Sequence, residues 1–198
     1  MTKSTDLEFC FKGNRKYVHG TDIFLKLIEE YNNNIEKIDI AFHGITVNNM
    51  TFFTEKPLNK DIKVAFRYVD GDMKIKYFGV ENNHTITCQY DYDEEKIVNN
   101  TTIMRSGESI TLDTQTEYSF IEHIVAMNKA LLEELYSDIQ GKWYFTRLQL
   151  KHNITMSTIS SLRLHLKSNF QFKLTKSSIV VNNTEIGFIY FSLIPKES

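Results

Sequence analysis

The amino-acid sequence predicts an α+β fold of two tandem units, each with the order strand, helix and four antiparallel strands. The first observation is a helical pattern in each half that precedes several segments of alternating apolar residues. The second is the similarity of VENNHTI at 80–86 to VVNNTEI at 180–186. The third is that apolar side chains alternate in the same phase in 61–66 and 161–166. Agreement in phase carries weight because a slip of one residue would reverse the buried face of a strand.

The first half opens with a strand-like segment at 7–11 and a helical pattern from Gly20 to Tyr31. Its apolar residues Ile23, Phe24, Leu27 and Ile28 recur at the spacing of one helix face. Four strands are expected to follow, at 35–47 with an extension to Thr54 left open, 62–69, 73–80 and 84–92. Asp70-Gly71 and Asn82-Asn83 are predicted as hairpin turns, because such residue pairs favour the backbone of tight turns.

The second half repeats this order with a longer helix. A strand is expected near 109–112, a helix at about 119–136, and strands near 142–151, 161–167, 170–175 and 185–194. We therefore divide the chain into repeats 1–95 and 96–198 and expect them to pack together.

Composition excludes several classes of function. The 198 residues are 41% hydrophobic with a formal net charge of −2, and no block of lysine and arginine indicates a nucleic-acid partner. No run approaches the length of a membrane span, so we expect a cytoplasmic protein. Cys10 and Cys88 are predicted to be reduced thiols, since two cysteines form neither a disulfide scaffold nor a zinc pattern. Neither a metal nor a cofactor is expected, because the sequence lacks a set of zinc ligands and a glycine-rich phosphate loop.

The order of elements resembles the hotdog fold, and the duplicated chain resembles a double hotdog. The segment FTEKPLNKDIKV at 53–64 is similar to a crossing between hotdog strands, with Lys60 where glycine is usual. Val18-His19-Gly20 is similar to the start of the helix in hotdog thioesterases of the phenylacetate-pathway type. That family has a second glycine after this one, and this sequence has Thr21 in its place. Tandem cystatin-like units are the alternative, because they also lay one helix on an antiparallel sheet.

The resemblance implies sites where the N-terminus of a buried helix meets a sheet. A helix start presents unpaired N–H groups and a positive dipole end, which favour the negative charge that develops on a thioester carbonyl. The candidate catalytic residues are His19, Asp22, Glu122, His123 and Asn128, and the candidate substrate-binding residues are Gly20, Thr21, Ser119 and Arg147.

Each candidate also has an ordinary structural interpretation. Asp22 and Glu122 stabilise a helix when they lie in its first turn, whether or not they take part in chemistry. His19 can close a turn, His123 can be partly exposed, and Arg147 can be a surface residue on an aromatic strand.

The resemblance implies an enzyme that acts on acyl thioesters of coenzyme A or an acyl carrier protein, as a thioesterase or a 3-hydroxyacyl dehydratase. His19 with Glu122 is the pairing expected across the halves. A binding module without chemistry and an acyltransferase of a polyketide or lactone pathway are the alternatives. A monomer whose halves form a pseudo-dimer, or a homodimer, is expected.

Overall fold

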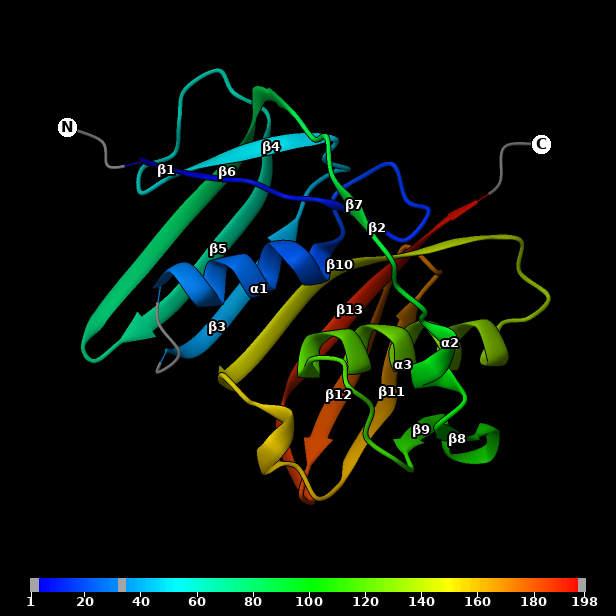
Figure 1. Cartoon of the computed structure of the whole chain (residues 1–198). Helices are drawn as coiled ribbons and strands as arrows, with labels where there is room; N and C mark the ends of the chain where they lie inside the picture. Colours follow the sequence, from blue (N-terminus) through cyan, green and yellow to red (C-terminus); the bar gives the residue numbers. More distant parts are fainter. Residues whose placement is uncertain (1–3, 32–34, 196–198) are drawn as a thin grey trace. The chain divides into compact units, whose positions relative to one another are not determined.

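The described residues form two compact units. The computed structural model describes residues 4–31 and 35–195. Unit 1 is Met1–Tyr92 and unit 2 is Asp93–Ser198 (Figure 1). That these units are repeats of one hotdog-like ancestor stays a prediction.

Unit 1 combines an antiparallel sheet with one long helix. Its sheet has the strand order β1-β4-β6-β5-β3, and β2 and β7 form a separate, parallel pair. The elements are β1 (Ser4–Leu7), β2 (Phe11–Lys12), α1 (Gly20–Tyr31), β3 (Glu36–Phe42), β4 (Asn48–Phe53), β5 (Ile62–Asp70), β6 (Met73–Thr85) and β7 (Gln89–Tyr90).

The core of unit 1 follows from the two periodicities of its sequence. The helix α1 buries the predicted stripe Ile23, Phe24, Leu27 and Ile28, which confirms its predicted bounds and its apolar face. The strands supply alternating residues, and Ile40, Phe52 and Phe66 are fully buried. The predicted hairpin at Asp70-Gly71 is also confirmed, since Asp70 pairs with Met73 and Gly71 has φ +57°.

The prediction for the rest of unit 1 is wrong in three places. The predicted strand 35–47 is shorter, because β3 ends at Phe42, and its suggested extension to Thr54 is the separate strand β4. The predicted turn at Asn82-Asn83 lies inside β6, because the β4 ladder continues along it from Met50↔Glu81 to Asn48↔Thr85. Of the predicted strand 84–92, the first two residues belong to β6 and only Gln89–Tyr90 form β7, which pairs in parallel with β2.

Unit 2 also has an antiparallel sheet, in the order β8-β9-β11-β12-β13-β10, with α3 packed against β9, β10, β11 and β13. The elements are α2 (Glu95–Val98), β8 (Thr101–Met104), the 3-10 helix η1 (Arg105–Gly107), β9 (Ser109–Leu112), α3 (Phe120–Leu135), β10 (Gly141–His152), the 3-10 helix η2 (Met156–Thr158), β11 (Leu162–Phe170), β12 (Leu174–Val181) and β13 (Thr184–Pro195).

Most elements of unit 2 match their predictions. The helix α3 and the strands β9, β10, β11 and β13 lie within a few residues of the predicted bounds. The predicted strand at 170–175 is wrong, because the chain reverses there between β11 and β12. Gln171 and Phe172 adopt positive φ values of 51° and 60° at this reversal, which their side chains do not signal.

The inner strands of the two sheets follow different orders. In unit 1, the second strand after the helix (β4) pairs with the fourth (β6). In unit 2, the second strand after the helix (β11) pairs with the third (β12). The similar stretches also differ, because Asn182 and Asn183 have φ values of 50° and 63° in a turn, whereas Asn82 and Asn83 are in a strand. Similar local sequence is therefore used in different local structures.

Neither described unit contains a helix that is long and apolar enough to cross a membrane. Within 4–31 and 35–195, the acidic, histidine and cysteine side chains form no group that could hold a metal ion.

Candidate functional site

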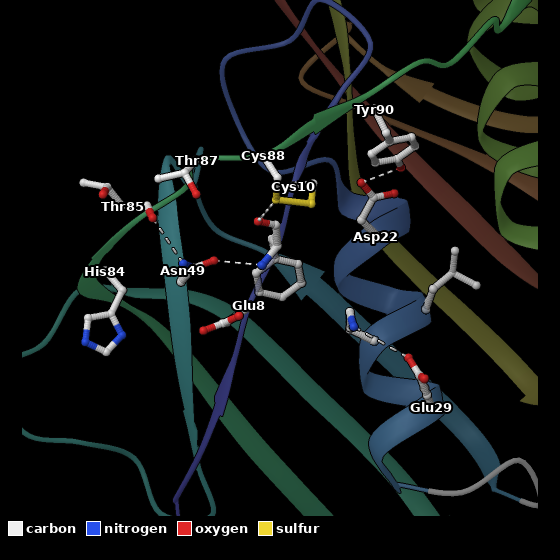
Figure 2. Close-up of a pocket in the computed structure, with 13 residues that line it drawn as sticks. Glu8, Cys10, Asp22, Glu29, Asn49, His84, Thr85, Thr87, Cys88 and Tyr90 are labelled. Atoms are coloured by element: carbon white, nitrogen blue, oxygen red, sulfur yellow. Dashed lines mark hydrogen bonds and ion pairs between the residues drawn. A yellow bond between two sulfur atoms is a disulfide. The ribbon is translucent and has the colours of Figure 1, made fainter.

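A groove of about 550 Å³ lies in unit 1, along one side of α1. The helix contributes Asp22, Leu25, Lys26 and Glu29, whose spacing of three and four residues places them on one stripe. At about 100° per residue this stripe lies opposite the buried residues Ile23, Phe24, Leu27 and Ile28, so the groove runs along the outer side of the helix. Figure 2 shows Asp22 and Glu29 on α1, with the other labelled residues on the facing segments.

The opposite side of the groove is made by three segments that are distant in sequence. Glu8, Phe9 and Cys10 come from the link between β1 and β2, and Asn49 comes from β4. The last part of unit 1 adds His84, Thr85, Thr87, Cys88 and Tyr90. Asn49 joins two of these segments, because its Oδ1 accepts the Phe9 N–H at 2.7 Å and its Nδ2 donates to the Thr85 carbonyl at 3.5 Å (Figure 2).

The Asp22 carboxylate is held by a buried lysine and a tyrosine. Lys12 is 0% exposed, and its Nζ donates to Asp22 Oδ1 at 3.2 Å. The Tyr90 hydroxyl donates to Asp22 Oδ2 at 2.8 Å, as Figure 2 shows. The ammonium group of Lys12 also lies 4.1 Å from the centre of the Tyr92 ring. A buried cation needs such partners, since desolvation of an isolated charge is costly.

Thr21 and His19 extend this cluster at the start of α1. Thr21 is completely buried, and its Oγ1 accepts from Lys12 Nζ at 3.1 Å and donates to Asp22 Oδ1 at 3.1 Å. With its hydroxyl hydrogen directed to Asp22, Thr21 Oγ1 accepts from His19 Nδ1 at 2.7 Å. The structure thus brings together His19, Thr21 and Asp22 with the adjoining Gly20, and of these Asp22 faces the groove.

The two cysteines form a disulfide on the wall of the groove, so the prediction of reduced thiols is wrong. The physical cause is the β2–β7 pairing, in which Phe11 N–H donates to the Cys88 carbonyl at 2.9 Å. This pairing brings the Cα atoms of Cys10 and Cys88 to 4.8 Å, within the range that a disulfide spans.

In unit 2, Ser119 and Glu122 form a capping box at the start of α3. Glu122 Oε2 accepts the Ser119 N–H at 2.8 Å and the Ser119 hydroxyl at 2.7 Å. These contacts satisfy donors that a helix start leaves without intrahelical partners, so both residues have a structural use.

His123 is completely buried, and its two ring nitrogens contact Ser119 and Thr116. Nδ1 lies 2.9 Å from the Ser119 carbonyl, which only accepts, so Nδ1 carries the hydrogen. Nε2 then accepts from the Thr116 N–H at 3.4 Å, with Thr116 Oγ1 at 3.0 Å. Burial lowers the pKa of His123 below its ordinary 6.5, which favours the neutral ring.

The other two predicted residues of unit 2 lie on α3 and β10. Asn128 is fully buried, and its side-chain amide has no hydrogen-bond partner among the described residues. Arg147 is half-buried on β10, with its guanidinium 5.7 Å from the centre of the Tyr190 ring. The catalytic and binding roles assigned to these residues from the sequence stay predictions, as does the pairing of His19 with Glu122.

Sequence reasoning missed Lys12, Tyr90 and the disulfide. Lys12 lies on a two-residue strand and Tyr90 on another, and 78 positions separate the bonded cysteines. The one available signal was the pair of cysteines itself, because two cysteines in one unit are enough for one bond.

No family model matches the chain, and no curated protein matches it. Among solved structures, the pyran synthase domain from module nine of the sorangicin pathway is 7% identical with a TM-score of 0.49, over 99% of this chain and 94% of that one. A putative thioesterase II from Thermobifida fusca YX is 8% identical with a TM-score of 0.48, over 96% and 91%. The 12:0-ACP thioesterase from Umbellularia californica is 8% identical with a TM-score of 0.46, over 99% and 97%. These three structures are two thioesterases and one pyran synthase domain.

Proposed function

We propose that the chain hydrolyses an acyl thioester of coenzyme A or of an acyl carrier protein in the groove of unit 1. The observation that carries this proposal is the position of Asp22, a carboxylate in the first turn of α1 that lines the groove. In hydrolysis, water attacks the thioester carbonyl and the thiol leaves. Asp22 would orient that water and accept its proton, while the positive end of α1 favours the negative charge on the carbonyl oxygen.

The size and lining of the groove support an acyl ligand. A volume of about 550 Å³ lies within the range of small-molecule pockets. Phe9 and Leu25 supply apolar surface on opposite sides, and Asn49 and Thr85 supply polar groups near them. The carboxylates of Glu8, Asp22 and Glu29 outnumber the one lysine of the lining, Lys26, so the phosphates of coenzyme A would lie outside the groove.

The test is the release of free thiol from a panel of acyl-coenzyme A thioesters of increasing chain length. Asp22→Asn keeps the side-chain shape and removes the base, so we expect kcat to fall by about 100-fold or more. Glu30→Gln is the matched control, because it removes the same charge from the same helix outside the groove. Equal activity in the two variants would contradict the role of Asp22.

A binding module without turnover is the second candidate, and the contacts of Asp22 favour it. Both carboxylate oxygens already accept hydrogen bonds, from Lys12 and from Tyr90, and these bonds occupy positions that a catalytic water would need. Isothermal titration with the same acyl-coenzyme A panel separates the candidates. Binding without thiol release would establish the module, and the absence of both would exclude an acyl-thioester function in this groove.

The remaining reactions proposed from the sequence need their own substrates. Dehydration is tested with 3-hydroxyacyl thioesters by the absorbance of the enoyl product, and acyl transfer is tested with an added acceptor. A cytoplasmic location and a monomeric or homodimeric state stay proposals as well.

A further inference from the structure

The Cys10–Cys88 disulfide is part of the groove rather than a buried staple. Both cysteines line the groove, as Figure 2 shows. Cys88 is exposed and Cys10 is half-buried. Of the two residues, Cys88 is therefore the more accessible to a thiol in the groove. Access of this kind distinguishes exchangeable disulfides from those enclosed in a core.

We propose that Cys88 is a thiol-exchange site, at which a thiol in the groove opens the disulfide. The entering thiol loses its proton and attacks Cys88 Sγ, the bond between the two sulfur atoms breaks, and Cys10 leaves as a thiolate that takes up a proton. The products are a mixed disulfide on Cys88 and a free thiol on Cys10. A second thiol, or the second group of a dithiol, then attacks the mixed disulfide and leaves both cysteines reduced, while the added thiols become a disulfide.

The identity of the natural thiol rests on the proposed function. Hydrolysis of an acyl thioester in this groove releases a pantetheine thiol beside the disulfide. Small cellular thiols such as glutathione share the same chemistry. Exchange with either one is a covalent modification of Cys88.

Opening the disulfide releases the segment that covers the Asp22 cluster. The β2–β7 pair is two residues long, and the backbone bonds that join its strands include Phe11 N–H to the Cys88 carbonyl and Gly13 N–H to the Tyr90 carbonyl. Residues 87–91 are exposed, so little apolar burial holds them. Once the disulfide is open, Tyr90 can leave Asp22, and the buried Lys12 behind it becomes accessible.

The experiment uses the full oxidised chain, incubated separately with pantetheine, with glutathione and without thiol. Intact mass and peptide mapping are expected to show one added thiol on Cys88, and iodoacetamide is expected to label Cys10. A faster reaction with pantetheine assigns the source to the leaving group of the substrate, and equal rates assign it to small thiols in general. An adduct on Cys10, or no adduct on the folded chain when the unfolded chain reacts, would overturn the proposal.

Hydrogen exchange then tests the release of the segment. Amide exchange in 86–92 is expected to rise at least tenfold on reduction, and α3 serves as an internal reference. The Cys10→Ser, Cys88→Ser double variant should form no adduct and should show the faster exchange without added thiol. Unchanged exchange in 86–92 on reduction would overturn the release. Both readouts are independent of turnover, so a failure of thioester hydrolysis does not affect them.

Discussion

The Lys12–Asp22 pair is the feature of unit 1 in which a single residue change should have the largest effect. Lys12 is fully buried, and Asp22 is 13% exposed in its side chain. Removal of one member of a buried ion pair leaves the other charge in a poorly solvated place. Loss of either residue should therefore destabilise unit 1, even if the intact pair itself adds little net stability.

We expect Asp22→Asn to lower the free energy of unfolding by about 3–5 kcal/mol, because the Lys12 ammonium loses its carboxylate. Urea denaturation followed by circular dichroism measures this loss. The double variant Lys12→Met, Asp22→Asn removes the buried charge as well and should recover most of the stability. A double variant as unstable as Asp22→Asn would contradict this account.

His123 should make stability depend on pH in one direction. Burial lowers its pKa in the folded chain, so the unfolded chain binds the proton more readily. The contribution is fully present above pH 6.5, the ordinary pKa, and is lost as the pH falls from there toward the lowered value. Urea midpoints at pH 7.5, 6.0 and 5.0 should fall steadily. His123→Gln removes the titrating ring, so a slope unchanged in this variant would assign the effect to other groups.

The candidate residues could be predicted from the sequence only in part. His19 to Asp22 were found because the start of a helix has a recognisable pattern, and the apolar stripe that follows fixes its position. Lys12 and Tyr90 were missed, because they reach Asp22 through the pairing of two short strands. Pairs that depend on distant segments leave no local pattern in one sequence.

At the scale of elements, helices were predicted better than turns. The apolar stripes of α1 and α3 span several turns, so each boundary rests on many residues. Asn82-Asn83 was misassigned because the preference of two residues was outweighed by the ladder with β4. The reversal at Gln171 and Phe172 was missed because neither residue type favours positive φ.

Gly187 should be the glycine least tolerant of substitution in the β10–β13 pair. A Cβ atom there would lie 2.0 Å from the Gln149 carbonyl oxygen on the neighbouring strand. We expect Gly187→Ala to cost more than about 2 kcal/mol, since the backbones must separate. Thermal unfolding of the full chain, with hydrogen exchange in β10 and β13 as the local readout, measures this loss of stability.

Gly71→Ala is the comparison variant, in a turn where nothing lies within 4 Å of the added atom. Its φ of +57° still disfavours a side chain, so a loss of about 1 kcal/mol is expected. Equal losses at the two positions would show that close approach of the strands is not the cause.

At the scale of the whole molecule, each unit has a long helix followed by strands of an antiparallel sheet, but the strands pair in different orders. β5 and β11 have the same length and lie 100 positions apart, as the alternation of 61–66 and 161–166 predicted. They occupy different places, because β5 is the third strand after its helix and β11 is the second. Phase was thus predictable from the sequence. The pairing of the strands was not predictable, because alternation shows which face of a strand is buried but not which strand lies beside it.

The disulfide should contribute strongly to the stability of unit 1, in which it closes a loop between positions 78 apart. We expect Cys10→Ser, Cys88→Ser to lower the free energy of unfolding by about 4 kcal/mol, because the unfolded chain gains freedom. Hydrogen exchange of the buried β4 and β5 amides under native conditions measures this loss. Protection equal to that of the oxidised chain would contradict it.

The parallel pairing of β2 with β7 has a consequence for the synthesis of the chain. The ribosome makes Phe11 and Lys12 early, but their partners Gln89 and Tyr90 are added at the end of unit 1. The nascent chain can form α1 and most of the sheet before that point. The Lys12 side chain therefore stays solvated until β7 is synthesised, so unit 1 completes its polar cluster last.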